Sequence, residues 1–150
     1  MKTINDLYTR KSERPIKVVQ FGEGNFLRAF VDYAIDIANE EGKFSGDVAI
    51  VKPIAFGNLD RFDAQDNLYT VVLRGKENGK VINSKRVITS VQKAVDPFKD
   101  YDGYMALASL ETLEFVVSNT TEAGIVFDPS DTFDGENGLP NTYPGKLTKF

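Results

Sequence analysis

Residues 16–42 read IKVVQFGEGNFLRAFVDYAIDIANEEG. The apolar run Ile16–Phe21 has the length and composition of a buried strand, and Gly22 ends it. Asn25 can cap a helix, because its side-chain oxygen accepts from the first free backbone N–H groups, and Gly42 supplies the stop. The stretch therefore predicts a strand, a glycine turn and a helix.

The helix that starts at Asn25 carries an apolar residue at every third or fourth position, which is the spacing of one helix face. We expect this face to pack on the core: Phe26, Ala29, Phe30, Tyr33, Ala34, Ile37 and Ala38. We expect the polar side chains of the helix to turn away from the core: Asp32, Asp36, Asn39 and Glu40.

Strand signals continue downstream of this helix. Val48–Val51 predicts a second buried strand, halted by Pro53, which completes a strand–helix–strand unit. Residues 69–73 and 81–91 are also strand-like, and Asn78-Gly79 between them is a strong hairpin signal. An antiparallel ribbon is therefore expected to interrupt the alternation of strands and helices.

The second half of the chain repeats the alternation. Asp96-Pro97 is expected to open a helix with proline at its first position, and Leu113–Val117 predicts a further strand. The apolar face of that helix would be Tyr101, Tyr104, Met105 and Ala108. The whole pattern predicts an α/β fold: a Rossmann-like, mostly parallel sheet with flanking helices and an antiparallel hairpin insertion, in one domain over residues 1–150.

Composition excludes several classes of function. The chain has 22 acidic and 18 basic residues, and this acidic balance argues against a nucleic-acid partner. Cysteine and histidine are absent, which excludes disulfides, thiolate nucleophiles, cysteine zinc sites and Ser-His-Asp chemistry. No apolar run could span a membrane, the N-terminus lacks a signal-peptide core, and no calcium-loop spacing occurs. We expect a cytoplasmic protein with no metal site.

An acidic segment lies between Glu122 and Gly145, where no lysine or arginine occurs. Its acids are Glu122, Asp128, Asp131, Asp134 and Glu136. Residues 128–140 are rich in Gly, Pro, Asp and Asn, which predicts a long solvated loop. A surface excursion is the simpler interpretation, and a lid or partner contact is the alternative.

Gly22-Glu23-Gly24 is the motif with the clearest chemistry. It follows a strand and opens a helix, the context in which G-x-G indicates nucleotide binding. Gly22 allows the tight turn, and Gly24 lets a pyrophosphate approach the backbone near the positive end of the helix. Arg28, in the first turn, could add a full charge toward the phosphates. A glycine turn without a ligand is the alternative.

Two residues depart from the usual dinucleotide pattern. Leu27 stands where G-x-G-x-x-G has its third glycine, and Lys52 stands near the expected ribose-binding acid. Lys52 suits either a 2′-phosphate, and so NADP, or a solvated strand-end charge, which we favour. Asp60 is the nearest later acid that could reach a ribose.

A second polar segment, Ser118-Asn119-Thr120-Thr121-Glu122, follows the predicted strand Leu113–Val117. Ligands of doubly wound sheets sit beyond the carboxyl ends of strands, so these side chains could hold a nicotinamide ribose or a substrate. Turn formation and helix capping are the alternatives. A methyltransferase-type α/β domain is a rival class, because it also has a glycine turn after its first strand.

Three separated segments resemble the mannitol dehydrogenase family of long-chain polyol dehydrogenases. Residues 18–30, VVQFGEGNFLRAF, are similar to its G-x-G-x-F-x-R-A element. Residues 65–70, QDNLYT, are similar to its Q-D-x-L-Y-T element, and residues 120–124, TTEAG, to its T-E-x-G element. The order of the three agrees with the family.

The resemblance implies NAD-linked hydride transfer to the keto group of a hexuronate, with a polyol dehydrogenase of the same family as the alternative, and NAD rather than NADP. It implies that the glycine turn lines the cofactor diphosphate and that the second polar segment lies near the nicotinamide. The implied cofactor-binding residues are Val18, Val19, Gln20, Phe21, Gly22, Glu23, Gly24, Asn25, Phe26, Leu27, Arg28, Ala29, Ser118, Asn119 and Thr120. Glu122 would lie at the edge of the active site.

The family's catalytic motif, K-x-x-x-x-N-x-x-H in a helical C-terminal domain, needs a histidine that this chain lacks. The helix-like residues 143–150 also end without a capping residue. We therefore expect a truncated N-terminal dinucleotide-binding domain with no catalytic residue of its own, able to bind dinucleotide but not to turn over substrate. A non-catalytic nucleotide-binding module is the alternative.

Overall fold

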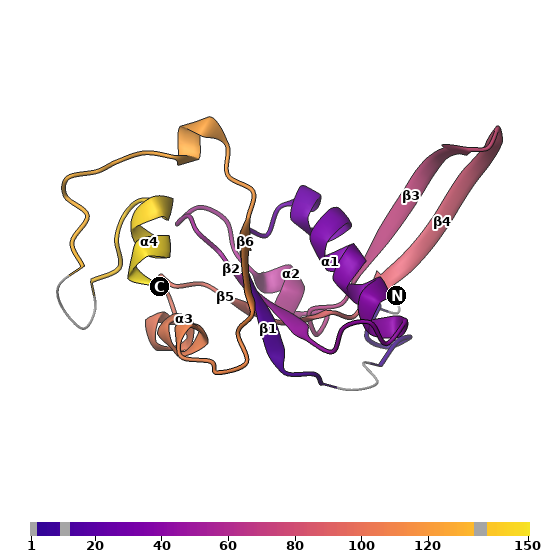
Figure 1. The fold of residues 1–150 in the computed structure, drawn as a ribbon, viewed down its shortest axis with the longest axis horizontal. Coiled ribbons are helices and arrows are strands. Elements are labelled where there is room, and N and C mark those ends of the chain that lie inside the picture. The colour runs from indigo at the N-terminus through magenta and orange to yellow at the C-terminus, as the bar shows by residue number, and fades with distance from the viewer. Residues whose placement is uncertain (1–2, 10–12, 134–137) are drawn as a thin grey trace.

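The computed structural model describes residues 3–9, 13–133 and 138–150. Its central sheet has four parallel strands in the order β5-β2-β1-β6 (Figure 1). The strands are β1 (Ile16–Phe21), β2 (Asp47–Val51), β5 (Val91–Val95) and β6 (Phe115–Ser118). The predicted α/β, Rossmann-like class is confirmed.

Helices cover both faces of this sheet. They are α1 (Asn25–Glu40), α2 (Asp60–Asp63), α3 (Tyr101–Ala108) and α4 (Tyr143–Lys149), with a short 3-10 turn η1 (Glu122–Gly124) after β6. One core cluster includes Val18 and Ile50 with Phe62 of α2, and Ile35 of α1 packs against it. The other includes Phe21 and Tyr104, so α3 and α4 share the opposite face. Alternate residues of β1 therefore enter different cores.

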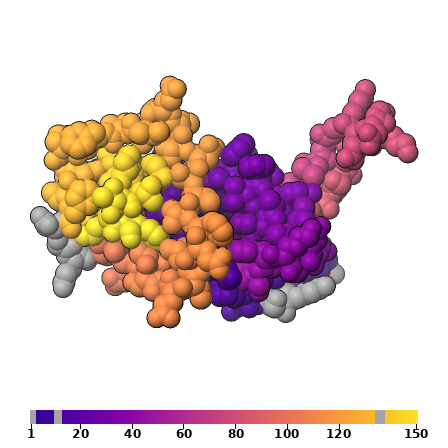
Figure 2. All heavy atoms as spheres, viewed as in Figure 1, coloured from indigo at the N-terminus to yellow at the C-terminus, as the bar shows by residue number. Residues whose placement is uncertain are grey.

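An antiparallel ribbon projects from this body, as both views show (Figures 1 and 2). It consists of β3 (Tyr69–Glu77) and β4 (Lys80–Ile88), and confirms the predicted hairpin. Asn78 and Gly79 both have positive φ, 50° and 78°, as the favoured two-residue hairpin turn requires. The ribbon beyond its base is exposed and carries Arg74, Lys76, Lys80 and Lys85 against Glu77.

Two element boundaries differ from the prediction. The strand-like run 81–91 is divided: β4 ends at Ile88, and β5 begins at Val91 in the other sheet. Asp96-Pro97 opens only a turn, because Asp100 caps α3 by accepting from Gly103 N at 2.8 Å. The helix therefore begins after Asp100, whose side chain caps it, and not at Pro97 as the sequence predicted.

The predicted orientation of α1 is wrong. Phe26 and Phe30 are 59% and 63% exposed, whereas Asp32 and Asp36 are 0% and 4% exposed. The two acids tolerate burial because both are hydrogen-bonded: Asp32 Oδ2 lies 2.7 Å from Tyr69 Oη, and Asp36 Oδ1 accepts from Thr89 N at 2.7 Å. Polar partners brought from distant segments outweigh the apolar periodicity of the helix.

Between η1 and α4 the acidic segment is irregular where it is described, and Asp134 and Glu136 lie outside the described residues. Asp131 is fixed rather than free, since it accepts from the backbone N–H groups of Asn141 at 2.5 Å and Thr142 at 3.3 Å. In the described part of the chain, none of the helices has the length and apolar character needed to cross a bilayer.

Candidate functional site

The two polar segments meet at one edge of the sheet. Phe21 of β1 pairs with Ser118 of β6, so the glycine turn and the polar segment leave neighbouring strands at the same level. The chain runs from β1 through α1 to β2 on one side, while β6 lies on the other side of β1. This is a topological switch point, where open α/β sheets form their ligand crevice.

Gly22 makes the turn that the sequence predicts. Its φ is +122°, a backbone conformation that L side chains rarely adopt, and its N–H donates to Val51 O at 2.9 Å. A Cβ at this position would lie 3.5 Å from Leu27 Cδ1. Leu27, buried at the third-glycine position, therefore packs directly against the turn, as the departure from the short pattern suggests.

Gly24 leaves the approach to the helix open. A Cβ there would meet no heavy atom within 4 Å. Gly24 is itself the N-cap residue and has no side chain to cap with, so the prediction that Asn25 caps the helix is wrong. Among the described residues, nothing accepts from the backbone N–H groups of Asn25, Phe26 and Leu27, and the first helical bond is Arg28 N to Gly24 O at 3.3 Å. Open space and unpaired amides suit an anion such as a diphosphate.

Arg28 lies one turn into α1 and is half-buried. Its Nη2 donates to Asn25 Oδ1, and its guanidinium packs over the rings of Phe62 and Tyr69, 5.6 and 5.4 Å from their centroids. Nε has no acceptor within the described residues. The guanidinium is thus held beside the helix N-terminus, and its contact with phosphate stays a prediction.

Some predicted cofactor residues can act only through their backbone. The side chains of Val18, Val19, Gln20, Phe21 and Leu27 are buried in the body of the domain. Gln20 supports the turn from below, because its Nε2 donates to Gly22 O at 3.1 Å. Glu23 is half-buried, and Ala29 and Phe26 are exposed along the start of α1.

Ser118 and Asn119 are exposed where β6 ends, and Thr120 is half-buried. Their side chains make no hydrogen bond to the described residues, and Thr121 caps η1 without using its hydroxyl. These side chains therefore do not cap η1, and their polar groups are available to bind a ligand. Glu122 is exposed at the start of η1, four residues after the end of β6. Their ligand contacts stay a prediction.

Lys52 is not the solvated charge that we favoured. It is 0% exposed, and its Nζ contacts Asp96 Oδ2 at 3.2 Å, Ile54 O at 2.7 Å and Ala55 O at 3.3 Å. An ammonium group has three donors, so these three acceptors use them all. Asp60 is exposed in α2, and its contact with a ribose stays a prediction.

A buried acid below the turn was missed by sequence reasoning. Asp32 is 0% exposed, and desolvation raises its pKa to about 6, although hydrogen bonds from Tyr69 and Gln20 oppose the shift. The available signal was the charged stripe Arg28, Asp32, Asp36 and Glu40, spaced four residues apart along α1. The two inner members of the stripe, Asp32 and Asp36, are buried and contact Tyr69 and Arg86, whereas Glu40 at its end is exposed.

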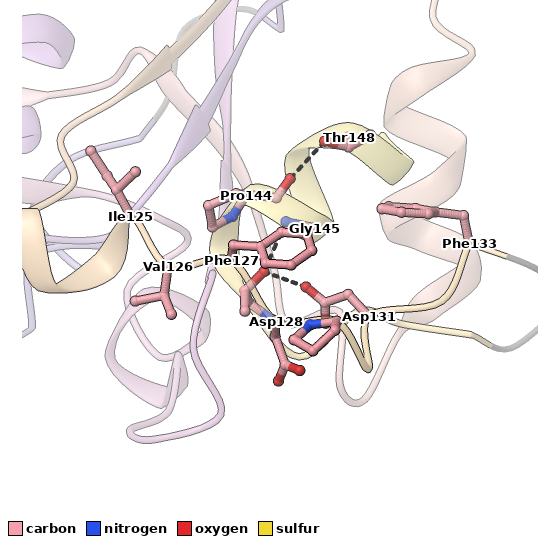
Figure 3. A pocket seen from close by; sticks show the side chains of 11 residues that line it. Ile125, Val126, Phe127, Asp128, Asp131, Phe133, Pro144, Gly145 and Thr148 are labelled. Carbon is pink, nitrogen blue, oxygen red and sulfur yellow. Dashed lines mark hydrogen bonds between the residues drawn. The ribbon is translucent and has the colours of Figure 1, made fainter.

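A separate pocket of about 490 Å³ lies between residues 125–133 and α4 (Figure 3). Its lining is mostly apolar, with Asp131 at one side. The Thr142 hydroxyl donates to Asp131 and holds the pKa of that carboxyl below its ordinary value. Neither polar segment of the switch point lines this pocket, so it is not part of the candidate site.

Comparison with known sequences also indicates a dinucleotide-binding domain. The sequence pattern of the mannitol dehydrogenase Rossmann domain matches residues 16–149. The altronate oxidoreductase of Bacillus subtilis is 44% identical over 151 residues, which cover 100% of this chain and 31% of the relative. That of Bacteroides thetaiotaomicron is 46% identical over 149 residues, 99% of this chain and 31% of the relative. The chain therefore spans about a third of the length of these relatives.

Two solved structures share the fold. One is Pseudomonas fluorescens mannitol 2-dehydrogenase in ternary complex with NAD and D-mannitol, with TM-score 0.67 and 22% identity, covering 78% of this chain and 24% of that one. The other is D-sorbitol dehydrogenase in substrate-free form, with TM-score 0.69 and 22% identity over 95% of this chain and 31% of that one. At this identity the likeness is one of fold.

Proposed function

The chain belongs to the mannitol dehydrogenase family, and from that premise we propose that it forms the NAD-binding domain of an oxidoreductase that interconverts tagaturonate and altronate by hydride transfer. The substrate assignment is supported by the altronate oxidoreductases that are 44% and 46% identical to it. A fructuronate reductase or another polyol dehydrogenase of the family is the alternative. The absence of cysteine suits a reducing compartment, so we place the enzyme in the cytoplasm.

The observation that carries the proposal is the open turn at Gly24 with its unpaired amides. The N–H groups of Asn25, Phe26 and Leu27 would bind the diphosphate, with the helix dipole adding to the attraction. Ser118, Asn119 and Thr120 would orient the nicotinamide half at the neighbouring strand end. NAD(H), when bound, carries the hydride, and the protein supplies position and electrostatics.

The buried Lys52 supports NAD rather than NADP. A 2′-phosphate is bound by cationic side chains with free donors. All three donors of Lys52 are already used by Asp96 and two backbone carbonyls. We infer that this lysine stabilises the strand end and is not available to bind a 2′-phosphate.

This chain has no histidine and so cannot contain the family's K-x-x-x-x-N-x-x-H motif, which would supply the group for proton transfer to the substrate oxygen. We propose that the full-length enzyme provides that motif, together with most of the hexuronate pocket. Glu122, at the edge of the cofactor crevice, would influence proton movement there. Residues 1–150 alone should bind NADH without oxidising it.

Replacing Gly24 with valine tests the proposal. The new side chain meets no protein atom at its Cβ, and Gly24 has an ordinary φ of −67°, so the melting temperature should stay the same. It would occupy the space that the diphosphate needs, and NADH affinity should fall about 100-fold, the equivalent of one or two charge-assisted hydrogen bonds. Fluorescence titration with NADH measures the effect.

Gly75→Val is the matched control, because Gly75 also has open space at its Cβ but lies in the projecting ribbon. It should bind NADH like the wild type. S-adenosylmethionine, offered as a second ligand, tests the methyltransferase class and should not bind. Wild-type affinity in Gly24→Val, or absence of NADH binding by the wild type, would contradict the proposal.

A further inference from the structure

The Q-D-N-L-Y-T element has no role in the site as described so far, yet its tyrosine reaches the cofactor helix. Tyr69 Oη lies 2.7 Å from Asp32 Oδ2 and 3.2 Å from Arg28 O. The Tyr69 ring also packs under the Arg28 guanidinium, 5.4 Å from the ring centroid. Two segments that are 41 residues apart therefore meet at one cluster, directly below the first turn of α1.

The number of hydrogen-bond donors in this cluster indicates whether the Asp32 carboxyl is protonated. A tyrosine hydroxyl has one proton, whereas an ionised carboxylate and a backbone carbonyl are both acceptors only. With Asp32 ionised, Tyr69 could satisfy one of its two close contacts but not the other. With Asp32 neutral, the carboxyl donates to Tyr69 Oη and Tyr69 donates to Arg28 O, so both contacts become hydrogen bonds.

The surroundings of Asp32 also favour the neutral acid. Its Oδ1 has no partner within the described residues, and the nearest further donor to Oδ2 is Gln20 Nε2 at 3.5 Å. Arg28 is the cation that acts on it, and Asp36, one turn further along α1, repels a negative charge. The Ser90 hydroxyl donates to the backbone carbonyl of Asp32 and not to its carboxyl group. Burial is the largest influence and raises the pKa to about 6.

Asp36 differs from Asp32 in spite of lying on the same helix face. Arg86 Nε donates to Asp36 Oδ2 at 2.6 Å, and Thr89 donates twice to Oδ1, at 2.7 and 2.9 Å. Both carboxylate oxygens of Asp36 are thus paired with donors. Asp32 lacks a comparable cationic hydrogen bond, which makes it the one of the two acids suited to hold a proton.

We propose that Asp32 is a positioning residue: in its protonated form it holds, through Tyr69, the first turn of α1 and Arg28 ready for the dinucleotide diphosphate, and loss of its proton weakens binding. This inference rests on the proposed NAD binding. An ionised Asp32 would place a negative charge below the diphosphate and would attract the Arg28 guanidinium away from it. A repulsion of about 1 kcal/mol between these like charges corresponds to about fivefold in affinity.

The test is the dissociation constant for NADH from pH 5.5 to 8 at fixed ionic strength. Wild-type affinity should fall about fivefold as pH rises through about 6, because the protonated form is lost in that range. Asp32→Asn, which cannot ionise, should give a flat profile. Asp63→Asn, at an exposed acid of α2, is the matched control and should keep the wild-type profile.

A purely structural role would lower the stability of Asp32→Asn without flattening its binding profile. NADH binding that is independent of pH in the wild type, or a retained slope in Asp32→Asn, would overturn the inference. The carbon-13 shift of the Asp32 carboxyl in protein without NADH gives a second measurement, which needs no folded variant. A midpoint near 6 supports the inference, and a midpoint near 4 overturns it. Failure of the wild type to bind NADH at any pH would instead overturn the proposed function.

Discussion

Replacing Lys52 with methionine is expected to lower the free energy of unfolding by about 3–5 kcal/mol, the usual cost of removing one partner of a buried ion pair. The Lys52 side chain is 0% exposed and that of Asp96 is 9% exposed, so solvent screens their interaction poorly. Methionine fills a similar volume but leaves the Asp96 carboxylate and two backbone carbonyls without their donor. Urea denaturation followed by circular dichroism measures the loss.

The double variant Lys52→Met with Asp96→Asn is the control. An asparagine oxygen can still accept from Phe98 N, which bonds Asp96 Oδ1 at 3.1 Å, and neither charge of the pair remains. The double variant should therefore recover most of the lost stability. Removing the Lys52 charge should also raise the pKa of Lys146, which burial and Lys52 now lower. A loss of less than 1 kcal/mol in the single variant would show that the pair contributes little.

Tyr104→Ala is expected to cost about 3–5 kcal/mol, as truncation of a fully buried aromatic side chain does. Tyr104 is 0% exposed and packs edge-on against Phe21, with ring centroids 6.4 Å apart. Its ring also lies 5.6 Å from that of Phe150, and its hydroxyl donates to Lys146 O at 2.5 Å. The Tyr104 side chain thus joins α3, α4 and β1, and its loss leaves a cavity among these three elements.

Tyr104→Phe separates packing from hydrogen bonding. It keeps the ring and removes the hydroxyl, so it should cost about 1 kcal/mol, the typical net value of one hydrogen bond. Chemical denaturation of the two variants under identical conditions gives both values. Equal losses in the two variants would show that the hydrogen bond to α4, rather than the packing of the ring, holds these elements together.

The strands, the glycine turn and the hairpin are confirmed because their signals are local. The run Ile16–Phe21 ends at a glycine whose positive φ the turn requires, and Asn78-Gly79 specifies its own turn type. The predicted run 81–91 joined the first residue of β5 to β4 and left residues 92–95 out, because the composition of this stretch does not separate an antiparallel strand from a parallel one. Where β4 ends and β5 begins depends on their partner strands in the folded chain, β3 for β4 and β2 for β5.

The orientation of α1 could not be predicted from its own sequence. The spacing of its phenylalanines predicted that they face the core, yet they are exposed. The residues that bond the buried Asp32 and Asp36 lie 37 and 53 residues away in the sequence. The same limit applies to Lys52, whose counter-ion follows the next parallel strand. Charged residues at the ends or faces of elements were predicted to be solvated, and the structure pairs them instead.

The projecting ribbon has a consequence for self-association. Both of its long edges present unpaired backbone groups, the kind of template on which copies of a protein add strand to strand into fibrils. Residues 72–85 carry Arg74, Lys76, Lys80 and Lys85 against Glu77 alone. Two ribbons brought edge to edge would therefore repel one another, and high salt, which screens that repulsion, is the condition under which aggregation of this protein should begin.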